Sequence, residues 1–172
     1  MQITVLTDAS YCPETRAGGW GAWVKADVWG IPLTFGGVIP ISLANNAEAE
    51  MMAMTYACSA LHSKGLFDDM VVAVLQCDSM RVLQLILNNL REAQVRPGTR
   101  PIEQGNTTTS QVEQVALTAL QDCFDPAIQV YVQHVKAFGR GNEDQKTSRK
   151  CDWIARHFMF QQRAKVLLGG RQ

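Results

Sequence analysis

With 172 residues, 47% of them hydrophobic, the chain is long enough for one domain with a full core. Its apolar runs, such as residues 70–75, are far shorter than the ~20 residues of a membrane span, and its first residues lack a signal-peptide pattern, so we expect a cytoplasmic protein without membrane contact. Net charge is zero, and five single cysteines without paired spacing argue against a zinc site or a disulfide framework.

Three strands with short, turn-rich connections are predicted first, and they indicate an antiparallel meander. β-branched residues predict a strand over 3–7, the glycine–aromatic segment predicts a second over 18–24, and a third covers 33–39. Residues 47–62 have a helical pattern rich in Ala and Met. The nearly continuous apolar run 70–76 is typical of a strand buried on both faces.

The second half of the chain continues with helices, loops and one more strand. Asp78 and Ser79 can cap a helix that runs to about Leu90, and the two prolines and two glycines of residues 95–107 predict a loop. The remaining predicted elements are a helix from Thr109 or Ser110 to Cys123, a strand over 128–135, a polar loop over 137–149 and a helix over 151–168. The order predicts a single α/β domain over 1–172, with a five-stranded mixed sheet of three antiparallel strands and then two parallel strands, flanked by helices.

Four acidic residues lie where strands end or helices begin, so that one fold can direct them at a common point: Asp8, Glu50, Asp78 and Asp152. Each alone is more typical of a turn or a helix cap. Asp8 and Asp78, however, follow strands that can pair in parallel, and ligands of open α/β sheets bind at that edge. Because clustered carboxylates resist ionisation unless a cation is bound, the pattern indicates a divalent-metal site. All-oxygen ligands suit Mg²⁺ or Mn²⁺, and two such ions can activate a water and stabilise the leaving oxygen of a phosphodiester.

Charged residues are distributed unevenly along the chain. Residues 1–90 carry four Lys/Arg against eight Asp/Glu, whereas residues 136–172 carry nine against three. A basic region beside an acidic cluster suggests a polyanionic partner with a metal ion between them.

Helix geometry separates Glu50 from Glu48. Residues two apart on a helix point about 200° apart, so the two cannot face one site. The row through Glu50 continues with Ala53, Met54, Ala57, Cys58 and Leu61, whereas the row through Glu48 continues with Met51, Met52, Thr55, Ser59 and His62. We therefore expect Glu50 to lie next to the sheet, and Glu48 to face solvent or to cap the first turn.

Five segments, taken in order, resemble the motifs of the ribonuclease H family: TDAS (7–10), GGWGAWV (18–24), AEMMAM (49–54), LQCDSMRVLQLI (75–86), and HVKAF (134–138) followed by CDWIAR (151–156). The resemblance covers nearly the whole chain. It implies the ribonuclease H-like fold and hydrolysis of the RNA strand of RNA–DNA hybrids, leaving a 3′-hydroxyl and a 5′-phosphate. It also implies that Asp8, Glu50, Asp78 and Asp152 are the catalytic residues and the ligands of two Mg²⁺ ions, with Mn²⁺ as an alternative. A monomer is expected.

Four further residues are candidates for substrate binding. Asn45 and Asn46 match the family's asparagines at the minor groove of the hybrid, and a polar helix cap is the alternative explanation for them. Arg140 and Lys146 lie in a basic stretch that is longer than the usual bacterial spacing, and we expect them to reach substrate phosphates. A solvated loop is the alternative for this stretch.

One position departs from the family's pattern. Phe138 stands where cellular members often carry a histidine that assists water activation or product release. His134, four residues earlier, is more typical of an ordinary strand residue bonded to a partner than of a substitute. The resemblance therefore predicts a working but slower enzyme.

Two other functions remain open from the residues alone. A junction resolvase or an exonuclease of the same fold would use the same carboxylate chemistry. A non-catalytic nucleic-acid-binding domain is the other alternative, which the missing histidine suggests. Retention of all four acids speaks against it, because an unused acidic cluster would repel a polyanion. The paired asparagines and the order of the motifs favour the hybrid-specific enzyme.

Overall fold

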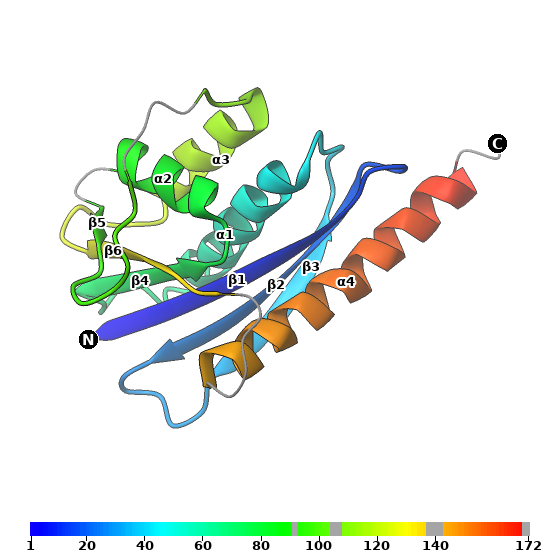
Figure 1. Ribbon diagram of the computed structural model, residues 1–172. Helices are drawn as coiled ribbons and strands as arrows, with labels where there is room; N and C mark the ends of the chain where they lie inside the picture. The colour runs from blue at the N-terminus through cyan, green and yellow to red at the C-terminus, as the bar shows by residue number, and fades with distance from the viewer. Residues whose placement is uncertain (91–92, 104–107, 137–142, 170–172) are drawn as a thin grey trace.

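The computed structural model describes residues 1–90, 93–103, 108–136 and 143–169, which form a mixed sheet with helices on both faces (Figure 1). The strands are β1 (Gln2–Cys12), β2 (Ala17–Ala26), β3 (Leu33–Ile39), β4 (Val72–Cys77), β5 (Gln94–Val95) and β6 (Gln129–His134). The helices are α1 (Asn46–His62), α2 (Met80–Asn89), α3 (Gln111–Gln121) and α4 (Glu143–Gly169). In space the strands follow the order β3-β2-β1-β4-β6-β5.

The sheet has an antiparallel half and a parallel half. β1, β2 and β3 pair antiparallel, which confirms the predicted meander, and β4 and β6 add to β1 in parallel. The predicted number of five strands is wrong by one. Gln94 and Val95 pair in parallel with Tyr131 and Val132 of β6, inside a segment whose prolines and glycines predict a loop. Two paired residues are too few to leave a strand pattern in the sequence.

β1 continues well beyond the predicted strand. Its pairing with β2 runs from Ile3 opposite Ala26 to Cys12 opposite Ala17, so Asp8 lies inside a strand and not after one. β4, in contrast, ends at Cys77 as expected. The two strands therefore differ in how they present their aspartates, and both aspartates still lie at the carboxyl end of β4.

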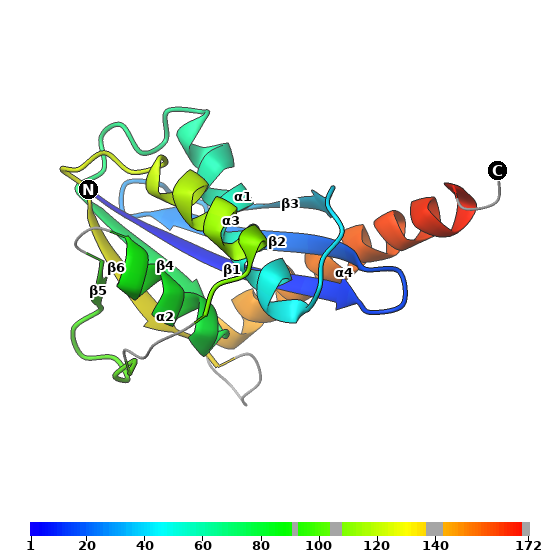
Figure 2. The same cartoon turned by 90° about the horizontal axis from the view of Figure 1, so that it is seen from above.

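α4 covers one face of the sheet and α1 covers the other. α4 packs along β1, β2 and β3, whereas α1 packs on the opposite face and is itself covered by α3 and α2 (Figures 1 and 2). Apolar side chains of β1, β4, α1, α2 and α3 form the main buried core. Burial of this apolar surface stabilises the sheet–helix layers and fixes the direction of α1.

Glycines of β2 let α4 approach the sheet closely. A Cβ atom at Gly19 would overlap the α4 backbone at Ala155, and a Cβ atom at Gly21 would overlap the backbone oxygen of Cys151. Only residues without a side chain fit at these positions. The glycines of the second-strand segment therefore determine how near α4, and with it Asp152, lies to the sheet.

α4 begins at Glu143, so the predicted helix start at residue 151 is wrong, as is the polar loop over the described part of 137–149. In this first part Ser148 is buried, whereas Lys146, Arg149 and Lys150 are exposed. So few buried side chains leave no apolar periodicity in the sequence. Across the described residues, no helix combines the length and the apolar character that crossing a bilayer requires.

Candidate active site

Parallel pairing brings Asp8 and Asp78 together. The last registered pair of β1 and β4 is Leu6 opposite Gln76, and each aspartate lies two residues further along the chain. The two carboxylates therefore come from neighbouring strands at the same level of the sheet. This edge, at the carboxyl end of β4, is where ligands of α/β sheets bind.

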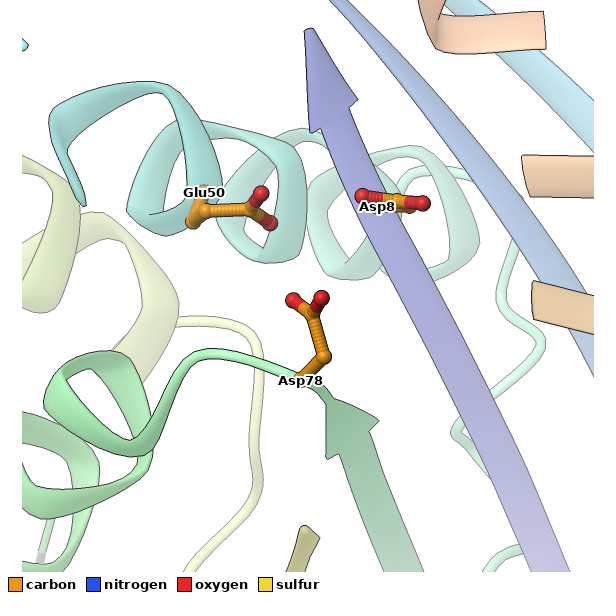
Figure 3. A group of neighbouring side chains, drawn as sticks. All are labelled: Asp8, Glu50 and Asp78. Carbon is orange, nitrogen blue, oxygen red and sulfur yellow. The ribbon is translucent and has the colours of Figure 1, made fainter. Parts of the chain in front are cut away.

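Glu50 of α1 completes a group of three carboxylates (Figure 3). One carboxylate oxygen from each of Asp8, Glu50 and Asp78 lies within 4.8 Å of the other two. α1 begins where the side chain of Asn45 accepts a hydrogen bond from the backbone N–H of Glu48 at 3.0 Å. This cap fixes the start of the helix and therefore the direction in which Glu50 projects.

Glu48 occupies a different environment from Glu50. Its carboxylate accepts a hydrogen bond from the backbone N–H of Ala44 at 2.7 Å, directly before the helix, and only 3% of the residue is exposed. Of the two expectations for Glu48, the solvent-facing one is wrong and the capping role fits. The row through Glu48 is also buried as far as Thr55, whose hydroxyl donates to the carbonyl oxygen of Ala116 in α3 at 3.1 Å.

The three carboxylates lie where ionisation is unfavourable. Burial, and then the charges of Asp78 and Asp152, raise the pKa of Asp8 to about 7. Burial, and then the charges of Asp8 and Asp78, raise the pKa of Glu50 well above its ordinary range. Burial also raises the pKa of Asp78. At neutral pH the group therefore retains protons unless a cation compensates the charge.

Only some of the oxygen atoms of these three carboxylates accept hydrogen bonds. Asp8 Oδ1 accepts from the backbone N–H of Ala9 at 2.9 Å, and Glu50 Oε1 accepts from the side-chain amide of Asn46 at 3.5 Å. Glu50 Oε2 is buried and has no hydrogen-bond partner among the described residues. A buried oxygen without a partner, beside two other carboxylates, fits a hard divalent cation, which prefers carboxylate oxygen ligands.

Asp152 approaches the group from α4. Its Oδ1 accepts a hydrogen bond from Arg156 Nε at 2.7 Å, one helical turn further along. Its negative charge raises the pKa values of both Asp8 and Asp78. Asp152 is outside the group of three whose oxygens lie within 4.8 Å. It is nevertheless close enough to interact electrostatically with two of its members.

Comparison with known proteins identifies the family to which this arrangement belongs. The profile of the RNase H family matches residues 1–159. The chain belongs to the RNase H family. Among curated proteins, no relative matches the chain.

Solved RNase H structures share the fold at low sequence identity. RNase H1 from the halophilic archaeon Halobacterium salinarum NRC-1 is 17% identical, with a TM-score of 0.62, and the match covers 94% of this chain and 99% of that one. The N-terminal RNase H domain of a Mycobacterium tuberculosis protein, solved as a fusion with maltose-binding protein, is 12% identical, with a TM-score of 0.66 and coverage of 96% and 98%. LC11-RNase H1, solved in complex with an RNA/DNA hybrid, is 14% identical, with a TM-score of 0.63 and coverage of 92% and 97%.

His134 lies beside the RNase H carboxylates. It ends β6 opposite Cys77, the last residue of β4, and its Nε2 lies 3.0 Å from the backbone oxygen of Asp78. A strand histidine bonded to a partner is what the sequence predicts, and the hydrogen bond fits that expectation. Its closeness to Asp78 does not follow from the sequence pattern alone. Aligning the ends of β4 and β6 would have revealed it.

The candidate substrate-binding residues that the structure describes come from two elements, the start of α1 and the first part of α4. Asn45 and Asn46 are exposed at the start of α1. Lys146 is exposed on α4 and not in a loop, while Arg140 lies outside the described residues, as does Phe138. The structure thus places three of the four candidates, and their roles remain predictions.

Proposed function

We propose that this protein is a metal-dependent endonuclease that hydrolyses the RNA strand of RNA–DNA hybrids and leaves a 5′-phosphate. The observation that carries this proposal is the group formed by Asp8, Glu50 and Asp78, with its raised pKa values and the partnerless Glu50 Oε2. Family membership supports nuclease chemistry at this group. The hybrid in the LC11-RNase H1 complex supports the choice of substrate.

Asp8, Glu50, Asp78 and Asp152 would hold two divalent ions, Mg²⁺ or Mn²⁺. When bound, such ions supply a nucleophilic water at neutral pH and neutralise charge on the scissile phosphate. The four carboxylates come from four separate supports: β1, the end of β4, α1 with its Asn45 cap, and α4. Because each support is packed into the sheet–helix layers, the carboxylates stay in position when the substrate phosphate approaches.

The exposed start of α1 would bind the sugar edge of the hybrid. Asn45 uses its side-chain oxygen to cap the helix, so its amide NH₂ group remains able to donate. Asn46 donates to Glu50, which links substrate contact at the helix start to the carboxylate group. A hybrid of A-like shape presents 2′-hydroxyls in a wide, shallow minor groove, so these amides can select RNA without reading bases. Lys146 and Arg140 would bind substrate phosphates.

A cleavage assay with four labelled substrates tests this function. We would incubate the protein with RNA–DNA hybrid, double-stranded RNA, duplex DNA and a branched junction, with and without Mg²⁺ or Mn²⁺. We expect metal-dependent cutting of the RNA strand of the hybrid alone. Asp8→Asn and Asp78→Asn should each abolish it, whereas Asp69→Asn, a change at an exposed acid before β4, should not. Cutting of the junction would instead favour a resolvase, and binding without cutting in any metal would favour a non-catalytic domain.

A further inference from the structure

The first part of α4 presents a basic, aromatic surface to solvent. Lys146, Arg149, Lys150 and Trp153 recur at spacings of three and four residues, so they share one side of the helix. All four are exposed, and Trp153 is 69% exposed. We call these four residues, together with the neighbouring Lys25 of β2, the α4 basic face.

Two adjacent hollows connect the members of this face. A hollow of about 400 Å³ is lined by Thr34, Arg149, Lys150, Trp153 and Ile154. A second hollow of about 290 Å³ is lined by Trp23, Lys25, Pro32, Lys146, Thr147 and Lys150. Lys150 lies between the two, and lysines from the sheet and from the helix converge on the second. The two shallow hollows therefore adjoin at Lys150 and place the cations of the face side by side.

The cations of the α4 basic face form no ion pair with the side chains that the structure describes, and these cations are Lys25, Lys146, Arg149 and Lys150. From residue 146 to residue 169 the sequence contains six Lys/Arg and a single acid, Asp152, which pairs with Arg156. A field of one sign over a hollow attracts a polyanion.

Trp153 adds a stacking surface within this field. Its indole stacks on the imidazole of His157, with ring centroids 6.0 Å apart and an interplanar angle of 17°. The indole is nevertheless mostly exposed to water. Cations lie before it at Arg149 and Lys150 and after it at Arg156, so the aromatic ring is interleaved with positive charge.

The α4 basic face is separate from the start of α1. α4 lies on one face of the sheet and α1 on the other (Figures 1 and 2), so a ligand on the α4 basic face and a hybrid contacted by Asn45 and Asn46 would occupy different surfaces. Contacts at the start of α1 therefore do not account for the α4 basic face, of which Lys146 alone is proposed above to bind the hybrid.

We propose that the α4 basic face binds single-stranded nucleic acid, with its cations against successive phosphates and an unpaired base stacked on Trp153. Single strands combine both requirements, because only an unpaired base offers its flat face to an aromatic side chain. An anionic membrane is less well matched. Helices that lie on membranes separate their apolar stripe from their cations, whereas here the indole lies among the cations, and Lys25 comes from the sheet.

Binding to a strand that the enzyme does not cut tests this proposal. We would measure the fluorescence anisotropy of a labelled oligodeoxythymidine of about 12 nucleotides with the full chain in EDTA. Trp153→Ala should weaken binding about tenfold or more, because stacking contributes on that scale. Arg149→Ala combined with Lys150→Ala should weaken binding and make its salt dependence shallower by roughly 1.4 in logarithmic slope. Lys64→Ala, at an exposed lysine after α1, is the matched control and should leave binding unchanged.

Conservative variants separate stacking from general apolar contact. Trp153→Phe should retain most of the binding, whereas Trp153→Leu should lose as much as Trp153→Ala. Equal binding by Trp153→Leu and the wild type would overturn the proposal, as would binding to vesicles of phosphatidylcholine and phosphatidylserine without binding to the oligonucleotide. Because EDTA removes divalent ions and oligodeoxythymidine contains no RNA, the outcome is independent of whether the protein cleaves hybrids.

Discussion

Asp8 lies in the middle of β1 and Asp78 directly after β4, yet both stand two residues beyond the pair formed by Leu6 and Gln76. The parallel register therefore places a carboxylate from a continuing strand beside one from a strand that has just ended. Because β4 stops there, the edge is open, and Glu50 can enter from α1 (Figure 3). This arrangement concentrates negative charge in a partly buried place, and several measurable properties follow from it.

Metal binding should release protons near neutral pH. The pKa of Asp8 is about 7, and burial and neighbouring charge also raise the pKa values of Glu50 and Asp78, so part of the group is protonated before a cation binds. A divalent cation favours the ionised form and displaces those protons. Calorimetric titration with Mg²⁺ in two buffers of different ionisation enthalpy should show more protons released at pH 6 than at pH 8, because at pH 8 Asp8 is largely ionised before the cation binds. The same number of released protons at both pH values would contradict this expectation.

Without metal, stability should fall as pH rises through the range set by Asp8. Its pKa is 3.8 when unperturbed and about 7 in the folded protein, so between these values the folded state retains a proton that the unfolded state has lost. The free energy of unfolding therefore decreases from about pH 4 to about pH 7 on account of this group. Asp8→Asn removes the effect, and its gain in stability over the wild type in EDTA should be about 4 kcal/mol larger at pH 8 than at pH 4.

Urea unfolding of both proteins at the two pH values would measure this difference. Glu113 acts in the opposite direction, because the neighbouring Arg81 lowers its pKa, but it is common to both proteins and its effect cancels. Glu50 and Asp78, whose pKa values are raised, act in the same direction as Asp8. Adding Mg²⁺ should stabilise the wild type far more than the variant. A stability difference that does not change with pH would show that Asp8 ionises normally.

Glu50→Gln and Glu48→Gln should differ in their effects on cleavage activity and on stability. Glu50→Gln removes a charge from the carboxylate group, so hybrid cleavage should fall at least about a hundredfold while the fold is retained or stabilised. Glu48→Gln leaves an oxygen that can still accept from Ala44, so cleavage should stay within a few-fold and stability should fall by no more than about 1 kcal/mol. Equal loss of activity in both variants would refute the assignment of Glu50.

The sequence predicts the local elements better than their contacts. Helix periodicity separates Glu50 from Glu48, because the two residues lie on different rows of one helix. It does not reveal that the row through Glu48 is buried as far as Thr55, because Thr55 contacts Ala116 of α3, which lies 61 residues further along the chain. Long-range packing of this kind is decided by tertiary structure.

The ends of strands and helices are likewise not always predicted by the local sequence alone. The apolar run before Asp78 marks the end of β4, whereas Asp8 is followed by residues that continue β1 only because β2 pairs with them. Likewise α4 begins in a polar stretch, where Ser148 is the one buried residue among 146–150. In both places the partner element, and not the local sequence, determines where the element stops or starts.

Substitution of a β2 glycine beneath α4 should destabilise the protein as much as substitution of a core residue. Gly21→Ala would place a Cβ against the backbone oxygen of Cys151, which can move only if α4 shifts away from the sheet. We expect a loss of about 2 kcal/mol or more in the free energy of unfolding. Weaker Mg²⁺ binding should accompany this loss, because Asp152 moves with the helix.

Gly30→Ala is the matched control. A Cβ at Gly30 meets no atom within 4 Å, so the free energy of unfolding of this variant should change by less than about 0.5 kcal/mol. Urea unfolding and Mg²⁺ titration of the two variants would measure both effects, and equal stability would show that α4 is not held at the glycines of β2.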